Sequence, residues 1–334
     1  MIRDARALRP EWTPHDLEHR EGAIDHVSTC LNPITQGFAG ENVLITGPSG
    51  AGKTTLARYV TDQLERETLG VRIGEVNCIS DSTPHSALHT LARDVGLGSD
   101  LSRDGTPSAE YLDRFRDADD HLVIILDEVD SLADPSLLVS LHELPSVTML
   151  LVCVDETDLR ADVDSRVDDR LRAAASIQLD AYSTSELVDI LEARADHGLA
   201  QTLGRETAER IAVHAGGSAR RAIAILRQAA LDADARQTGL SPGLVDDAVT
   251  DAEVDVRERT KAQLSSHHRL LLDIVEQHEE LAASDLHERY EARASTPKSK
   301  ATRRRYLTAL RRYDLVEAEG STRDRTYRLA TAED

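Results

Sequence analysis

A glycine-rich segment is the first group of residues that could do chemistry. It follows an apolar run, residues 43–46, and reads Gly47-Pro48-Ser49-Gly50-Ala51-Gly52-Lys53-Thr54-Thr55. Glycines at this spacing let the backbone curl until successive N–H groups point at one anion. A lysine there reaches the β- and γ-phosphates of a nucleoside triphosphate, and the next hydroxyl is a Mg²⁺ ligand. The spacing of residues 56–64 supplies the helix that such a loop requires. We therefore predict that residues 47–55 bind ATP or ADP and that Thr54 also holds Mg²⁺.

A pair of carboxylates, Asp127 and Glu128, follows the apolar run of residues 122–126. Such a run is typical of a buried parallel strand, which presents these acids at its carboxyl end. In enzymes with a phosphate-binding loop, the first acid supports the Mg²⁺ shell, and an adjacent glutamate can polarise the attacking water. We predict Asp127 as a Mg²⁺ ligand and Glu128 as a catalytic residue.

The elements that must position these residues alternate along the first half of the chain. Amphipathic segments separate short apolar runs, which predicts an α/β fold in which helices cover both faces of a parallel sheet. After Tyr182 the apolar residues recur at helical spacing, which predicts a small all-helical domain. The expected strands are residues 43–46, 71–76, 122–126, 147–154 and 177–179, and the later helices are residues 183–199, 206–214, 219–230 and 242–249.

The C-terminal part has a different composition, with seven Lys or Arg and no Asp or Glu in residues 295–313. A helical projection places Tyr306, Leu310 and Tyr313 on one face and the basic residues on the other. Arg303 falls near the apolar edge and is a candidate structural residue. Helices at 264–278 and 283–290 precede this basic helix, and strands at 315–318 and 325–329 follow it.

This order of helices and a hairpin is that of a winged-helix domain, which puts its basic helix in the major groove of DNA and its hairpin against the backbone or minor groove. A basic face can also bind acidic protein surfaces, so a docking role is the alternative. The residues predicted to contact duplex DNA are Lys298, Lys300, Arg304, Thr308, Arg311, Arg323 and Arg325.

Composition limits the class of protein. The chain has 334 residues, enough for two or three domains, a net charge of −21 and only four lysines. Acidic surfaces poor in lysine favour a cytoplasm of very high salt, as in halophilic archaea; an acidic mesophile protein is the alternative. Cys30, Cys78 and Cys153 lack metal-ligand spacing and are expected to be buried in a reducing cytoplasm. The apolar runs have the length of strands, so we expect a soluble, cytoplasmic protein without membrane contact.

With these motifs in view, the chain resembles archaeal origin-recognition/cell-division-control (Orc/Cdc) type replication initiators of the AAA+ superfamily. The resemblance begins at residues 8–14, continues through His19-Arg20-Glu21, which is similar to a family segment near the adenine, and includes both nucleotide motifs. It implies three domains: an AAA+ base at residues 1–181, a helical lid at 182–256 and a winged helix at 257–334. The local pattern of Thr13 and Pro14 is by itself only a good helix start.

The resemblance also implies further nucleotide contacts, from Tyr182, Arg194 and Arg220. Arg220 would lie over the γ-phosphate as the family's second sensor, whereas Arg194 is equally consistent with a solvated helix arginine. Arg166 is similar to the arginine finger that the family supplies to a neighbouring subunit. Arg170 and Arg172 lie close enough to compete for that role.

One departure from the family pattern concerns the first sensor, where Asp155 stands in place of the usual asparagine. An asparagine can donate a hydrogen bond to the γ-phosphate or orient the water, but an ionised aspartate only accepts and repels the phosphate. We therefore predict slow hydrolysis.

The function implied by the resemblance is to mark replication origins on duplex DNA and to help load the replicative MCM helicase, with ATP binding as the switch. Other copies of the chain or paralogous initiators are further expected partners on DNA, and the protein would associate with the nucleoid. Two alternatives remain. One is an ATP-binding DNA regulator without helicase loading, and the other is an AAA+ machine that uses its winged helix to dock proteins.

Overall fold

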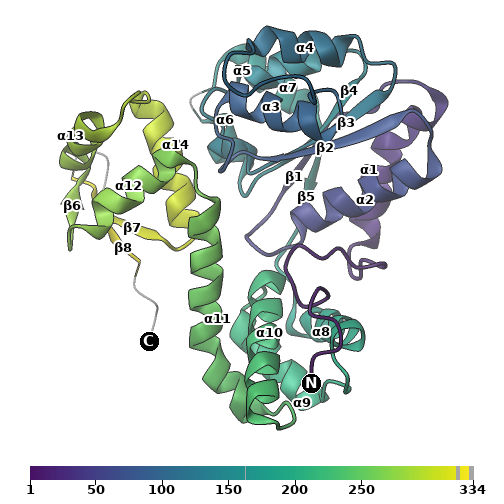
Figure 1. Cartoon of the computed structure of the whole chain (residues 1–334), viewed down its shortest axis with the longest axis vertical. Helices are drawn as coiled ribbons and strands as arrows, with labels where there is room; N and C mark the ends of the chain where they lie inside the picture. The colour runs from purple at the N-terminus through teal and green to yellow at the C-terminus, as the bar shows by residue number, and fades with distance from the viewer. Residues whose placement is uncertain (162, 321–323, 331–334) are drawn as a thin grey trace. The chain divides into compact units, whose positions relative to one another are not determined.

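The computed structural model describes residues 1–161, 163–320 and 324–330 (Figure 1). The chain divides into two compact units. One comprises residues 1–69 and 175–258, and the other comprises residues 70–174 and 259–334. Each unit is therefore built from two separate stretches of sequence, and each contains part of the predicted nucleotide site.

In the first unit, strands β1 (Val43–Thr46) and β5 (Ala175–Gln178) pair in parallel, with Val43 opposite Ala175. All four residues of β1 are buried, as expected for an apolar strand in a parallel sheet. Helix α1 (Glu21–Leu31) continues into a 3₁₀ turn, η1 (Asn32–Gln36), and helix α2 (Lys53–Glu67) begins directly after the glycine-rich loop. Strand β5 begins two residues before the predicted strand 177–179, because Ala175 and Ser176 also pair with β1.

The rest of the first unit is helical, with α8 (Thr184–Gly198), α9 (Arg205–Ala215) and α10 (Ala219–Arg236) packed on one another. Helix α8 begins where expected because Ser183 forms a capping box: its Oγ accepts from Glu186 N–H, and its own N–H donates to the Glu186 carboxylate at 2.7 Å. The core of these helices is made of small and branched apolar side chains, including Leu187, Leu191, Ile211, Ala222, Leu226 and Val245.

Helix α11 (Pro242–Gln263) is longer than predicted, since the expected helix ended at residue 249. Two of the acidic residues beyond that point are ion-paired with arginines of α10. Glu253 pairs with Arg221, and Asp255 lies 2.8 Å from Arg227. These pairs offset like-charge repulsion along this part of the helix. The boundary between the two units falls within this helix.

The second unit contains three parallel strands in the order β2-β3-β4: β2 (Val71–Asn77), β3 (His121–Asp127) and β4 (Val147–Val152). Strand β4 ends two residues before the predicted limit. Helix α3 packs on β2 and α4, and α5 packs on β4 and α7. The helices and the 3₁₀ turn η2 are α3 (Pro84–Asp94), α4 (Ser108–Arg116), η2 (Val129–Ser131), α5 (Ser136–His142), α6 (Glu156–Arg160) and α7 (Ser165–Ala173).

The C-terminal part of the second unit packs three helices against a small antiparallel sheet of order β6-β8-β7 (Figure 1). Its core contains Leu271, Tyr290, Tyr306, Leu310 and Tyr327. The elements are α12 (Ser266–Glu276), β6 (Leu281–Ala282), α13 (Ala283–Arg293), α14 (Lys300–Arg312), β7 (Val316–Glu319) and β8 (Thr326–Leu329).

The predicted α/β class, with parallel strands and covering helices, is confirmed. The three cysteines are buried, as expected. No described helix is both long and apolar enough to cross a membrane. The division into domains at residues 181 and 256 stays a prediction.

Candidate functional site

The glycine-rich loop, residues 47–52, is tightly surrounded within the first unit. Gly50 and Gly52 have φ angles of 80° and 89°, in the left-handed region that favours glycine. A Cβ atom on Gly50 would lie 2.1 Å from the Ser218 hydroxyl, and one on Gly52 would lie 2.6 Å from the Tyr182 hydroxyl. Both positions therefore require glycine for conformation and for space.

Lys53 is buried at the first position of α2, and its ammonium group lies inside the curve of the loop. Nζ donates to the carbonyl oxygens of Gly47 and Pro48, at 2.7 and 2.9 Å. Thr54 and Thr55 follow in the first turn, where helix N–H groups and the positive end of the helix dipole favour an anion. A buried cation at a helix N-terminus fits a phosphate chain.

Two predicted residues of the helical part reach this loop. Arg220 Nη1 donates to Ser49 Oγ at 3.4 Å, and Ala219 N–H donates to the Gly50 carbonyl at 3.1 Å. The Tyr182 ring is buried, and burial raises the pKa of its hydroxyl. The start of α10 and the residue before α8 are thus brought to the predicted phosphate site.

Arg20 also belongs to this site, although it is absent from the predicted set of nucleotide contacts. Its guanidinium lies 3.8 Å from the centroid of the Tyr182 ring and donates to the Ala51 and Asp180 carbonyls. Beside it lies a cleft of about 390 Å³ lined by ten residues of the first unit, a size typical of small-molecule sites. The sequence feature that could have identified Arg20 was the His19-Arg20-Glu21 element. The cleft is lined by His19, Arg20, Glu21, Gly22, Ala23, Gln178, Leu179, Asp180, Ala181 and Glu186.

Arg194 has a different environment from the one predicted. Its guanidinium is buried and donates to the carbonyls of Ala7, Arg9 and Trp12 at 2.7–2.9 Å. It also lies over the Trp12 ring, and burial lowers its pKa to about 10. Arg194 is not a solvated helix residue, because its guanidinium fastens the N-terminal segment to α8. Its predicted contact with the nucleotide stays a prediction. Backbone carbonyls can be supplied by any residue, so the spacing of residues in the sequence could not predict this buried arginine site.

In the second unit, Asp127 and Glu128 lie at the carboxyl end of β3, as predicted, and both are buried. Asn77, at the end of the neighbouring strand, donates to Asp127 Oδ2 at 3.4 Å. Glu128 has a φ of 52°, which is unusual for a residue other than glycine. Its carboxylate accepts a hydrogen bond of 2.6 Å from the Tyr313 hydroxyl. Residues other than glycine that are held at positive φ cluster at functional sites.

Asp155 and Arg166 lie at the N-termini of two short helices. Asp155 is exposed and caps α6, because its carboxylate accepts the Thr157 N–H at 2.6 Å. Arg166, in the first turn of α7, is 74% exposed and lies 3.7 Å from Asp164. Of the two competing arginines, Arg170 is exposed and Arg172 pairs with Asp168 at 2.8 Å. The roles predicted for these residues stay predictions.

The basic helix forms as α14, and its two faces separate as predicted. Tyr306 and Leu310 are buried, whereas Lys300, Arg304 and Arg311 are exposed. Arg303 is 5% exposed and donates to the His287 carbonyl at 3.0 Å, which confirms a structural role. Lys298, Thr308 and Arg325 are partly buried. Arg323 lies outside the described residues.

Comparisons with known proteins agree with this architecture. Residues 37–162 match the family model described as "AAA domain". The chain is 39% identical to ORC1-type DNA replication protein 9 of Halobacterium salinarum, over 98% of this chain and 94% of that protein. It is 38% identical to ORC1-type DNA replication protein 1 of the same organism, over 90% and 98%.

Solved structures give the same result at the level of the fold. The ORC2 protein of Aeropyrum pernix, as ADPNP-ADP complexes, is similar with a TM-score of 0.66 and 26% identity, over 98% of this chain and 94% of that one. The ORC1 protein of Aeropyrum pernix in complex with DNA has a TM-score of 0.74 at 24% identity, over 99% and 94%.

Proposed function

We propose that this chain, which belongs to the family of ORC1-type DNA replication proteins, is an ATP-dependent initiator that binds duplex DNA at replication origins. The observation that carries the proposal is that a cation of the helical part reaches the phosphate-binding loop: Arg220 of α10 donates to Ser49, and Ser218, the residue before α10, lies beside Gly50. An arginine supplied by a separate helix can bind a triphosphate differently from a diphosphate, so the position of that helix can depend on which nucleotide is bound.

For the nucleotide, the proposed ligands are the loop backbone, Lys53 and Arg220 for the phosphates, and Tyr182 with Arg20 beside the adjoining cleft. Thr54 and Asp127 would hold Mg²⁺, which supplies charge neutralisation for the β- and γ-oxygens. Glu128 would orient the attacking water. We assign an ATPase activity to this set, and the aspartate at position 155 supports slow turnover because it offers no donor.

For DNA, the support comes from the exposed cations of α14 and from the order of three helices and a small antiparallel sheet, which is consistent with the proposed winged helix. The related ORC1 protein of Aeropyrum pernix was solved in complex with DNA. We propose that Lys300, Arg304 and Arg311 face the duplex and that the β7–β8 hairpin contacts its backbone or minor groove.

Assembly and partners follow from the same proposal. An exposed Arg166 at the start of α7 supports an arginine finger offered to another copy or to a paralogous initiator. Recruitment of the MCM helicase would occur on chromosomal DNA in the cytoplasm. An ATP-binding regulator without helicase loading predicts long-lived nucleotide and no recruitment, and a docking machine predicts no duplex binding in high salt.

The nucleotide part of the proposal is tested by the substitution Lys53→Ala. Removing the ammonium leaves phosphate charge uncompensated, so we expect most of the triphosphate affinity to be lost with little change in the unfolding midpoint. Titration with a fluorescent ATP analogue measures the affinity. Lys261→Ala, which removes an equal charge from α11, is the matched control and should bind as the parent does. Equal affinity of the Lys53→Ala protein and the parent would refute the site.

A further inference from the structure

Helix α14 and the acidic end of β3 are in contact within the second unit. Tyr313, at the C-terminus of α14, donates its hydroxyl to Glu128 Oε1 at 2.6 Å. One residue earlier, Arg312 pairs with the buried Asp130 and with Asp158, the latter at 2.6 Å. Adjacent residues of the DNA-binding candidate helix thus hold two acids of the Glu128–Ser131 segment.

The ion pair between Arg312 and Asp130 is buried and is not a solvent-exposed salt bridge. The side chains of Arg312 and Asp130 are 14% and 2% exposed. Burial lowers the pKa of Arg312, and the nearby Glu128 charge opposes that shift. Leaving either of these buried charged groups without its partner would cost free energy. The pairing of Arg312 therefore fixes the end of α14 and with it the position of Tyr313.

Further contacts of the C-terminal helices lie around the same strand ends. Tyr306 donates to Ser82 Oγ at 3.1 Å, Thr302 donates to the Ala133 carbonyl at 3.4 Å, and Ser265 N–H donates to the Ile79 carbonyl at 3.1 Å. Ile79 and Ala133 also pack with the C-terminal core. The loops after β2 and β3 therefore form one seat for α14 and for the start of α12.

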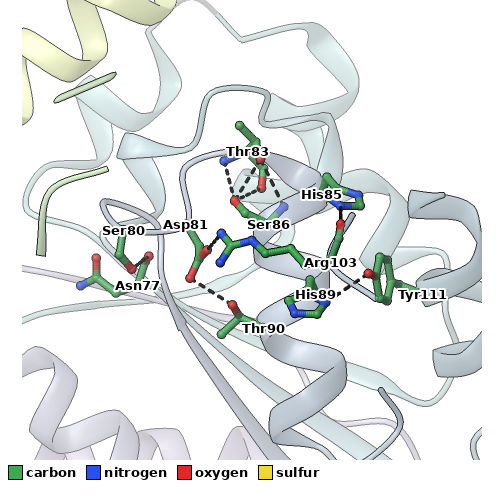
Figure 2. A network of polar contacts seen from close by, with 10 residues as sticks. All are labelled: Asn77, Ser80, Asp81, Thr83, His85, Ser86, His89, Thr90, Arg103 and Tyr111. Carbon is green, nitrogen blue, oxygen red and sulfur yellow. Dashed lines mark hydrogen bonds and ion pairs between the residues drawn. The ribbon is translucent and has the colours of Figure 1, made fainter. Parts of the chain in front are cut away.

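The seat after β2 is itself held in place by a polar network (Figure 2). The Asp81 carboxylate accepts bonds of 3.0 Å from both Thr90 and Arg103, and Ser80 Oγ donates to the Asn77 carbonyl at 2.9 Å. Thr83 and Ser86 form a capping box that starts α3. These bonds fix the part of the seat that follows β2, so a change at this contact is expected in α14 and not in that loop.

Building on the proposed function, we infer that Tyr313 is a positioning residue that restrains Glu128 and so couples hydrolysis to the binding of DNA by α14. The Tyr313 hydroxyl occupies a lone pair of the carboxylate that would otherwise orient water. Arg304 and Arg311 lie on the same helix, so a duplex bound to them competes with the seat for the position of α14. Release of Tyr313 frees Glu128 Oε1, and the rate of ATP hydrolysis rises.

The substitution Tyr313→Phe tests this inference in the full-length protein, since it removes the hydroxyl and keeps the ring. We expect kcat for ATP to rise severalfold with KM unchanged, and duplex DNA to stimulate the parent more than the variant. The matched control is Tyr306→Phe, which removes the other tyrosine hydroxyl of the seat without touching Glu128 and should leave kcat unchanged. An unchanged or lowered kcat in Tyr313→Phe, including the absence of turnover in both proteins, overturns the inference.

A second readout needs no nucleotide. If the bond forms in solution, Tyr313→Phe lowers the unfolding midpoint of the parent but has a smaller effect when Glu128→Ala is already present. Equal effects in both backgrounds contradict the contact. Nucleotide affinity separates this result from the proposed function: loss of binding in Lys53→Ala supports the site whatever the rates of the tyrosine variants are, and retained binding there counts against the site alone.

Discussion

The carboxylate of Asp155 accepts the Thr157 N–H at 2.6 Å and so caps α6. An asparagine at this position would cap the helix equally well, because both residues accept a bond from the first turn. It would differ in being neutral and in having an amide donor. At the residue scale, the helix cap and the first sensor can therefore be separated by two substitutions at one position.

We predict that Asp155→Asn raises kcat for ATP hydrolysis while the unfolding midpoint stays the same. Asp155→Ala, in contrast, loses the cap and is expected to cost ~1 kcal/mol of stability without the donor that speeds hydrolysis. Steady-state kinetics and thermal unfolding of the three proteins provide the measurement. If both variants accelerate hydrolysis alike, charge removal and not the amide donor is responsible; if neither does, Asp155 is not a sensor.

Individual residues differ in how far the sequence could place them. Lys53 and Asp127 belong to motifs whose spacing encodes a backbone shape, so their positions followed from the pattern. Arg220 was identified only through the family resemblance. The environments of Arg194 and Tyr313 depend on contacts with residues 182 or more positions away. No local spacing records such a contact, and the helical projection could show only that Tyr313 faces inward.

At the scale of elements, alternation and capping placed the strands and most helices correctly, and the errors have a common cause. The predicted helix ended at residue 249, whereas α11 continues past Glu253 and Asp255, which pair with arginines of α10. Strand β5 was shifted because its partner strand and not its own hydrophobicity sets its start. In both cases tertiary contacts override the local pattern.

The packing of α12 makes a prediction about acid stability. His268 is completely buried beside the Tyr306 ring, with its Nδ1 2.8 Å from the Ser265 hydroxyl, and burial lowers its pKa to about 3 from the usual value of 6.5. The folded protein thus binds fewer protons than the unfolded chain between these values. Stability supplied by the neutral ring is complete above pH 6.5 and is lost progressively as the pH falls.

A shift of that size corresponds to on the order of 4 to 5 kcal/mol by pH 3. We expect His268→Leu to flatten the dependence of the unfolding free energy on pH between 6.5 and 3, whatever its effect at neutral pH. Denaturant unfolding across this range measures it. The control is His26→Gln on the exposed side of α1, which should keep the slope of the parent. An unaltered slope in His268→Leu would mean that the ring titrates normally.

At the scale of the whole molecule, the proposed function requires a chain of net charge −21 to bind a polyanion through a small basic helix. At low salt the acidic surface repels the duplex, and near 1 M salt the Debye length is only about 3 Å, so both this repulsion and the attraction of exposed cations are screened. Counterion release also contributes little there. Binding that persists must rest on shape and direct base contacts.

We therefore predict that the full-length protein binds origin duplex in molar potassium chloride and that the double substitution Arg304→Ala/Arg311→Ala weakens this binding by ~1 to 3 kcal/mol for each residue that contacts a base. Sequence preference should relax in parallel, because base contacts and not phosphate contacts discriminate. Isotherms on origin and scrambled duplexes supply the measurement. Arg205→Ala, an exposed arginine of α9 that pairs with Glu209, controls for lost charge and should bind like the parent. Should the double variant bind origin DNA as tightly as the parent, α14 is not the reading element, and a docking role for its basic face becomes the better account.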